Sequence, residues 1–158
     1  MFGSKRHYIY LMGNISTDDC THIWRENITD VMESDPVVMV NPCLNHWNKQ
    51  LREAHKTGNT EDIARIRNQA QRSLRPKDYQ MIRPCTLAIW NTLYDDPNRP
   101  TMASIVEHTW CIDIFKLPVI MIAKEGSPFL SHSWFATYNA AVVTTVWDAV
   151  VHVRELYL

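Results

Sequence analysis

Glu107 is the residue of this 158-residue chain whose type and setting most suggest chemistry. It lies a few residues after Pro100, in a stretch of mostly apolar or small residues that predicts a helix from Thr101 to about Phe115. An acid in the first turns of such a helix has two interpretations: a surface glutamate favoured by the helix macrodipole, or a nucleophile at the ligand edge of a sheet. The residues alone leave both interpretations open.

Two pairs of neighbouring residues, each containing a tryptophan, are further candidates for ligand contacts. His46 lies beside Trp47 after the second predicted strand, and Asn91 lies beside Trp90 at the end of the third. These side chains could stack on a base and read its edge. The alternative is packing, because the six tryptophans of a chain this size more often belong to the core.

The elements that must position these residues are strands alternating with helices. Four short apolar runs predict buried strands at residues 8–12, 37–40, 85–90 and 117–122. Helical patterns between them indicate one α/β domain covering residues 1–158, with a doubly wound, Rossmann-like and mainly parallel sheet flanked by helices.

Three other segments complete the predicted architecture. Residues 48–73 are polar and contain Gly58 and Asn59, which predicts an excursion of two exposed helices. Pro76 predicts the start of a separate short helix, and residues 134–157 predict one long terminal helix. The apolar stripe of that helix is expected to cover the sheet or a second subunit. The stripe consists of Ala140, Val143, Val146, Val150 and Val153.

Ligands of doubly wound sheets bind beyond the carboxyl ends of the strands, so the loops after the predicted strands are the expected binding region. The candidate binding residues in these loops and at the helix start that follows the third are Gly13, Asn14, Ile15, Ser16, His46, Asn91, Thr101, Ala103 and Ser131.

Composition narrows the class of partner. With 16 basic and 17 acidic residues the formal net charge is −1, which excludes the positive field that a nucleic-acid polymer needs. One phosphate is still allowed, because free amides at a helix N-terminus bind it without excess Lys or Arg. The four cysteines have no zinc-type spacing, and Walker and Gly-x-Gly-x-x-Gly motifs are absent, so we expect no metal and no cofactor. The apolar run at residues 8–12 is too short for an export signal or a membrane span, so we expect a cytoplasmic protein without membrane contact.

Four segments, taken in order, resemble the nucleoside 2-deoxyribosyltransferase superfamily. They are Tyr10-Leu-Met-Gly13, Asp78 shortly before a strand, residues 100–107 ending in Glu107, and Lys116-Leu-Pro-Val-Ile. The resemblance spans roughly residues 8–122 without the excursion. It implies that Glu107 is the nucleophile, that Asp78 supplies the departing base with a proton or hydrogen bond, and that Tyr10 holds Glu107 through its hydroxyl. Without the resemblance, Asp78 is equally a helix N-cap and Tyr10 a packed strand residue.

Within that superfamily the motifs are closest to the 2′-deoxynucleoside 5′-phosphate N-hydrolases. Thr101 after a proline resembles their Pro-Ser, and a hydroxyl beside free amides suits a phosphate where the transferases have an acid. Ser131 after a leucine resembles the serine with which they reach a phosphate in the neighbouring subunit, which implies a homodimer or higher homo-oligomer with shared sites. Ser16 replaces their arginine, and Ala103 and Ser104 replace the family's glycines beside the ligand.

The expected function is therefore cleavage of the base–sugar bond of a (deoxy)nucleoside 5′-monophosphate. A carboxylate such as Glu107 captures the oxocarbenium-like sugar as a covalent glycosyl-enzyme, which water then releases. Two alternatives stay open. One is a 2-deoxyribosyltransferase, in which a second base accepts the sugar. The other is a non-catalytic nucleotide-binding protein on the same scaffold, which the missing glycines at Ala103 and Ser104 favour.

Overall fold

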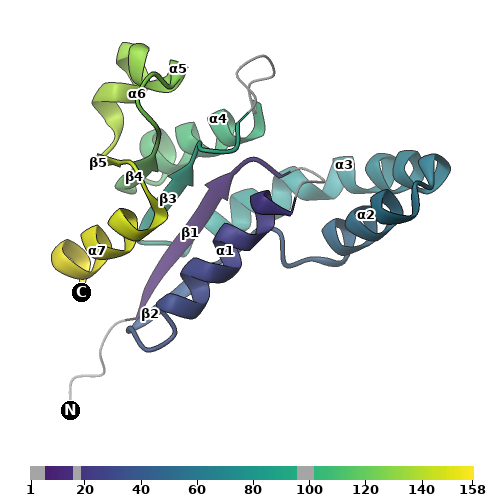
Figure 1. The fold of residues 1–158 in the computed structure, drawn as a ribbon, viewed down its shortest axis with the longest axis horizontal. Coiled ribbons are helices and arrows are strands. Elements are labelled where there is room, and N and C mark those ends of the chain that lie inside the picture. The colour runs from purple at the N-terminus through teal and green to yellow at the C-terminus, as the bar shows by residue number, and fades with distance from the viewer. Residues whose placement is uncertain (1–5, 16–18, 96–101) are drawn as a thin grey trace.

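The computed structural model describes residues 6–15, 19–95 and 102–158, and these form an α/β fold around a parallel sheet (Figure 1). Within the described residues the sheet has five strands, all parallel, in the order β2-β1-β3-β4-β5. This is one of the two common doubly wound orders, and it confirms the predicted fold class. The strands are β1 (His7–Gly13), β2 (Val37–Val40), β3 (Leu87–Asn91), β4 (Val119–Ile122) and β5 (Ala141–Val143).

Helices cover both faces of this sheet, which explains why its strands are apolar without interruption. Successive residues of a strand point to opposite faces, so a strand covered on both sides must be apolar at every position. The helices are α1 (Cys20–Val31), α2 (His46–Thr57), α3 (Thr60–Ile82), α4 (Met102–Thr109) continued by the π-helical η1 (Trp110–Ile114), α5 (Pro128–Ser131), α6 (Ser133–Tyr138) and α7 (Val146–Tyr157).

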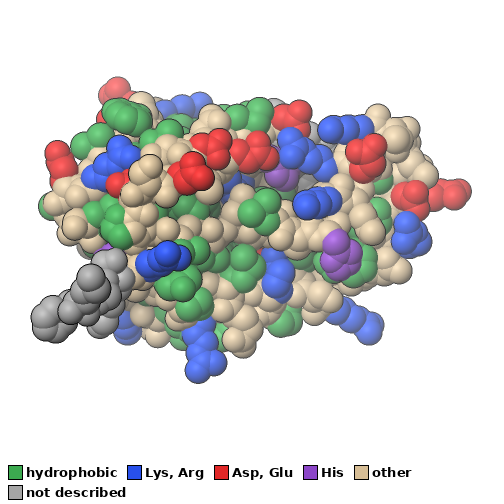
Figure 2. All heavy atoms as spheres, turned by 90° about the horizontal axis from the view of Figure 1, so that it is seen from below, with side chains coloured by type: hydrophobic (Ala, Val, Ile, Leu, Met, Phe, Trp, Pro, Cys, Tyr) green, Lys and Arg blue, Asp and Glu red, His purple; other side chains and the backbone are tan. Residues whose placement is uncertain are grey.

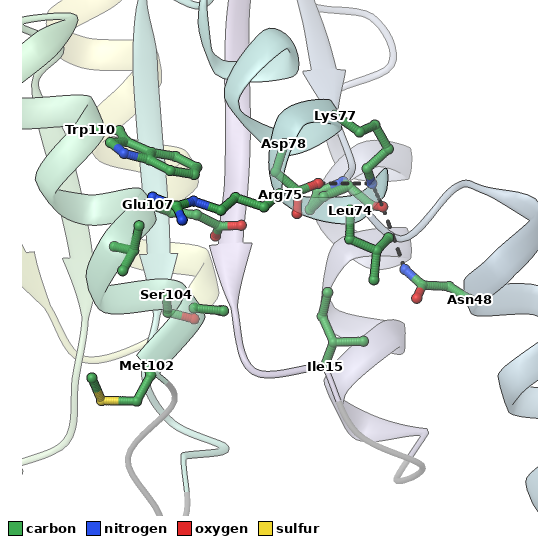
Figure 3. Close-up of a pocket in the computed structure, with 14 residues that line it drawn as sticks. Ile15, Asn48, Leu74, Arg75, Lys77, Asp78, Met102, Ser104, Glu107 and Trp110 are labelled. Carbon is green, nitrogen blue, oxygen red and sulfur yellow. Dashed lines mark hydrogen bonds and ion pairs between the residues drawn. The ribbon is translucent and has the colours of Figure 1, made fainter. Parts of the chain in front are cut away.

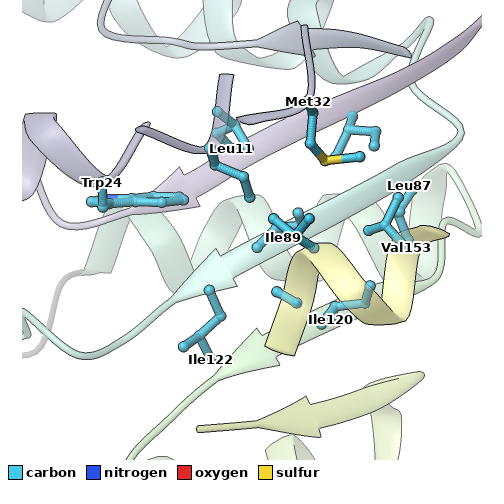
Figure 4. Close-up of a cluster of buried hydrophobic side chains, with 12 residues drawn as sticks. Leu11, Trp24, Met32, Leu87, Ile89, Ile120, Ile122 and Val153 are labelled. Atoms are coloured by element: carbon cyan, nitrogen blue, oxygen red, sulfur yellow. The ribbon is translucent and has the colours of Figure 1, made fainter. Parts of the chain in front are cut away.

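The first face of the sheet packs against α1 and α7 (Figure 4). Leu11, Ile89 and Ile120 of the central strands contact Trp24 of α1 and Val153 of α7 in one buried cluster. The second face carries Tyr10 and Trp90 toward α3, α4 and η1, together with α5 and α6. The core therefore has two layers, and the second layer is the one that contains the candidate nucleophile's partner, Tyr10.

The helical excursion is larger than predicted, and its internal break is where the sequence placed it. Gly58 ends α2 in the left-handed conformation at φ 68°, and the side chain of Asn59 caps α3 by accepting from the Asp62 amide. The prediction that Pro76 begins a separate helix is wrong, because α3 runs continuously from Thr60 to Ile82. Ile82 is fully buried in the second core layer, and this packing holds the last turns of α3 in place despite the missing N–H of the proline.

The prediction of one terminal helix over residues 134–157 is also wrong. The segment forms α6, then the edge strand β5, then α7. A capping box begins α7: the Thr145 hydroxyl accepts from the Asp148 amide, and the Asp148 carboxylate accepts from the Thr145 amide. Of the predicted stripe, Val150 and Val153 are buried against the chain's own sheet, Val143 and Val146 are partly buried there, and Ala140 is exposed.

The surface charges, the hydropathy of the helices and the state of the cysteines bear on three of the expectations from the sequence. On the face seen in Figure 2, Lys and Arg side chains are mixed with Asp and Glu instead of forming one basic patch. Among the described residues, no helix has both the length and the apolar character that a bilayer crossing requires. All four cysteines are free thiols, and Cys43, Cys85 and Cys111 are buried.

Candidate active site

A cavity of about 510 Å³ lies between the carboxyl end of β1 and α4, the helix that follows β3 in the chain. These two strands are neighbours at the point where the strand order reverses, which is where doubly wound proteins bind ligands. Its walls come from the loops after β1 and β2, from α2 and α3, and from α4 with the start of η1 (Figure 3). Among the predicted site residues, those that line it are Gly13, Ile15, Asp78, Ala103 and Glu107.

Glu107 faces this cavity from α4 and is 8% exposed. The hydroxyl of Tyr10, which is fully buried on β1, donates a hydrogen bond of 3.1 Å to Glu107 Oε1. The two residues are 97 positions apart in the sequence, and the sheet brings them together because β1 lies directly beneath α4. The predicted contact between Tyr10 and Glu107 is therefore present, and Glu107 is not a surface glutamate.

The environment of Glu107 favours its neutral form. Burial raises its pKa to about 8, and the negative charge of Asp78 contributes to the rise. The hydrogen bond from Tyr10 and the positive charges of Arg25 and Lys77 act in the opposite direction. Burial and the nearby Glu107 carboxylate raise the pKa of Tyr10 well above its ordinary value, so its hydroxyl remains a donor.

Asp78 faces the same cavity from α3. Lys77 Nζ lies 2.8 Å from Asp78 Oδ1 and donates to the Pro42 carbonyl, also at 2.8 Å, which ties α3 to the loop after β2. Burial raises the pKa of Asp78, and Lys77 opposes that rise. Since α3 is continuous, Asp78 lies near its C-terminal end, and the alternative that Asp78 caps a helix N-terminus is wrong.

Gly13 forms part of the cavity wall at the end of β1, and its lack of a side chain is required there. A Cβ at this position would lie 2.7 Å from the Asn91 carbonyl oxygen, closer than packed atoms approach. Asn91 itself is buried and supports the site from behind: its Oδ1 accepts from the Leu93 amide at 2.9 Å, and it does not line the cavity.

Three other residues predicted to bind the ligand do not line the cavity. Asn14 donates to the Tyr94 carbonyl at 3.0 Å, which joins the loops after β1 and β3. His46 begins α2, and its ring centroid is 4.1 Å from that of Trp47. Ser131 is exposed and donates to Pro128 of its own chain at 2.9 Å. Ser16 and Thr101 lie outside the described residues.

The structure adds cavity residues that the sequence analysis missed, and three of them belong to α3. Leu74, Arg75 and Lys77 line the cavity together with Asp78. A helix continued through Pro76 places such positions on one face, so reading the proline as a helix start concealed the pattern. Trp110 closes the opposite wall, and the Arg75 guanidinium carbon lies 5.7 Å from the centroid of its ring.

The comparisons with known proteins add no family assignment: no protein-family model and no curated protein matches the chain. In the part of the chain that the structure describes, no group of three or more His, Cys, Asp or Glu side chains is arranged to hold a metal ion.

Proposed function

We propose that the chain is an N-glycosidase that cleaves the base–sugar bond of a (deoxy)nucleoside 5′-monophosphate. The observation that carries the proposal is the buried Tyr10–Glu107 hydrogen bond at the wall of a cavity that also contains Asp78. A carboxylate held by a donor and faced by a second carboxyl group is the arrangement with which retaining glycosidases work.

The proposed reaction uses one proton shared by the two acids. As the pH rises, Asp78 loses its proton before Glu107 does. The negative charge of the ionised Asp78 is one reason why the pKa of Glu107 is raised, so Glu107 keeps its proton to about pH 8. Turnover requires the opposite distribution, with Glu107 ionised and Asp78 protonated. Glu107 then bonds to C1′ as the C1′–N bond breaks, and Asp78 gives its proton to the departing base. Water next attacks C1′, returns a proton to Asp78 and frees the Glu107 carboxylate.

The length of α4 supports an orientation for the nucleotide. Met102, Ala103 and Ser104 line the cavity at the N-terminal end of α4, Trp110 lines it beyond the other end, and Glu107 lies between them (Figure 3). A phosphate suits the free amides of the N-terminal end. The base then lies at the end near Trp110 with Asp78 beside it, where an indole ring offers a stacking surface.

The direct test is incubation of the protein with a panel of nucleoside 5′-monophosphates and nucleosides, followed by chromatography of the products. Free base plus sugar phosphate supports hydrolysis. A new nucleoside formed when a second base is present supports the 2-deoxyribosyltransferase alternative. Glu107→Gln keeps a hydrogen-bond acceptor for Tyr10 but removes the nucleophile, so it should reduce base release by at least about a thousandfold. Base release that survives this substitution contradicts the proposal.

A binding protein without turnover is the second candidate, and the preference of Glu107 for its neutral form favours it. The cavity wall also has side chains at Ala103 and Ser104, where the resembled family has glycines. Calorimetric titration with the same monophosphates separates the two. Tight binding with no base released over prolonged incubation supports sequestration. A cytoplasmic location and a homodimeric assembly with shared sites are further parts of our proposal.

A further inference from the structure

Arg25 of α1 is a charged residue with no solvent exposure, and it lies directly behind the candidate site. Its guanidinium donates to the carbonyls of Leu11 at 3.2 Å, Gly13 at 2.9 Å and Asn14 at 3.4 Å, and to that of Thr21 one turn earlier in α1. Among the described residues, no carboxylate lies within ion-pair distance of it. Buried arginines normally have an acidic partner, so this one needs an explanation.

The hydrogen bonds of Arg25 converge on the segment that forms the cavity wall. Three of its four acceptors belong to residues 11–14, the end of β1 and the loop that follows. Arg25 Nη2 would lie 3.5 Å from a Cβ placed on Gly13, and Gly13 lines the cavity. Arg25, which does not itself line the cavity, therefore fixes the position of the end of β1 and the start of the β1–α1 loop.

The charge of Arg25 also acts on Glu107. The charged and titratable groups that influence Glu107 are Tyr10 on β1, Asp78 and Lys77 on α3, and Arg25 on α1. Two thiols are also within electrostatic range, Cys43 after β2 and Cys111 on η1. Of the two cations, Lys77 is paired with Asp78, whereas the partners of Arg25 are backbone carbonyls and the Trp24 ring, whose centroid lies 4.6 Å from the guanidinium carbon. The carboxylates that act electrostatically on Arg25 include Glu107 and Asp95.

We propose that Arg25 is a positioning residue that holds the end of β1 and the start of the β1–α1 loop at the cavity wall, and that its buried positive charge acts on Glu107 from there. It touches no ligand in this role. Its effect on turnover rests on the proposed glycosidase function, because the active proton distribution requires an ionised Glu107. Its effects on the loop and on the ionisation of Glu107 do not depend on that function.

The test compares Arg25→Gln with Arg25→Lys. Glutamine donates two hydrogen bonds but is neutral, and lysine keeps the charge without the planar fork. The readout is carbon NMR of protein labelled at the glutamate carboxyls, with the Glu107 signal assigned by its loss in Glu107→Gln. We expect the titration midpoint of Glu107 to rise by roughly 0.5 to 1 in Arg25→Gln and to change little in Arg25→Lys. Amide hydrogen exchange at Asn14 and Ile15 should be faster in both variants. Arg52→Gln, which removes a partly exposed arginine paired with Asp19, is the matched control and should change neither readout.

A measurement on the unsubstituted protein decides the case even if both Arg25 variants fail to fold. The Nε nitrogen shift of Arg25 should follow the titration of Glu107, with a midpoint near pH 8, and should lose this dependence in Glu107→Gln. An Arg25 signal insensitive to Glu107 overturns the proposal, as does an unchanged Glu107 midpoint in a folded Arg25→Gln. None of these readings needs turnover, so an absence of glycosidase activity would leave their outcome intact.

Discussion

At the scale of residues, the site consists of two acids whose surroundings differ. Glu107 is buried with a hydroxyl donor, and Asp78 is paired with Lys77. Environments that separate the pKa values of neighbouring acids assign them different roles in catalysis. Between the two pKa values the pair holds one proton, and the form that the proposed reaction requires, with that proton on Asp78, is the minor one.

This sharing predicts a bell-shaped pH dependence of kcat/KM. Above about pH 8 Glu107 loses its proton, the pair has none left for the base, and the rate should fall. At low pH Asp78 is also protonated and Glu107 cannot ionise, so the rate falls below the raised pKa of Asp78. The measurement is kcat/KM from about pH 4 to 10.

The variant Asp78→Asn serves as the control for this prediction. It should be slow, and its remaining kcat/KM should rise with pH, because only the ionisation of Glu107 then matters. Its midpoint should lie below that of unsubstituted Glu107, since the charge that helps to raise the pKa of Glu107 is gone. A rate in the unsubstituted protein that keeps rising above pH 8 would show that Asp78 is not the proton donor.

Tyr10 gives a second prediction at this scale. Tyr10→Phe removes the hydrogen bond that stabilises the Glu107 carboxylate, so kcat/KM should fall by about 10- to 100-fold. Tyr8→Phe is the matched control, because Tyr8 lies on the same face of β1 two residues earlier and is 39% exposed. Equal rates for the two variants would mean that Tyr10 contributes only to packing.

At the scale of elements, the strands could be predicted because burial on both faces leaves an uninterrupted apolar run, as in Val119–Ile122. The π-helical end of α4 and the edge strand β5 could not be predicted from the sequence. Ala141–Val143 is only three residues long, and its apolar side chains fit a helical stripe as well as a strand. Pro76 was misleading for another reason. The local preference of proline for the first turn predicts a helix start there, but the packing of the buried Ile82 stabilises a helix that continues through the proline.

At the candidate site, some residues could be predicted from their sequence neighbours, and others could be found only from the packing of the folded chain. Glu107 stood out because it is an acid in an apolar helix, and Gly13 because it ends a strand. Arg25 and Trp110 gave no local signal, because a buried arginine within a polar helix face and a tryptophan after a helix are ordinary in a sequence. Their positions follow only from how α1 and η1 pack on the sheet.

The start of α7 supplies a prediction that distinguishes the observed elements from one terminal helix. Thr145 caps α7, so Thr145→Ala should lower the free energy of unfolding by about 1 kcal/mol. In a single helix over residues 134–157 the same change would be stabilising, because alanine is the better helix former. Denaturant unfolding measures the difference. Thr137→Ala, at an exposed position within α6, is the control and should be neutral or slightly stabilising.

At the scale of the whole molecule, the feature that bears on assembly is a pair of exposed aromatic side chains on α6. Trp134 and Tyr138 of α6 are 46% and 48% exposed, and their rings lie 4.8 Å apart near the edge strand β5. The stripe on α7 is covered by the chain's own sheet, so α7 no longer argues for a second subunit. The shared-site assembly implied by Ser131 stays a prediction.

Hybrid oligomers test that prediction. If each site needs Glu107 from one chain and Ser131 from the next, mixing inactive Glu107→Ala with Ser131→Asp subunits should restore about a quarter of the activity in a dimer that exchanges at random. Ser131→Asp alone must be inactive for the test to apply, and activity retained in that variant argues for sites complete within one chain. An active monomer in sedimentation leads to the same conclusion.

The stability of the whole molecule should depend on pH through Glu107. Its pKa is about 8 in the folded protein against an ordinary value of 4.5, so the folded state holds the proton more tightly than the unfolded state. The stabilisation from this proton is complete below about pH 4.5 and is lost as the pH rises to about 8, because the unfolded chain gains by ionising over this range while the folded chain does not.

Glu107→Gln removes this dependence while keeping the size of the side chain and an acceptor for Tyr10. The variant should therefore gain stability relative to the unsubstituted protein between pH 5 and 9, by on the order of a few kcal/mol in the free energy of unfolding. Urea unfolding at several pH values measures the difference, and Glu125→Gln, at an exposed glutamate, should follow the unsubstituted protein throughout. A constant difference across this range would mean that Glu107 is already ionised in the folded state. The proton proposed to move to Asp78 would then have to come from another group, because the site would hold none to share at neutral pH.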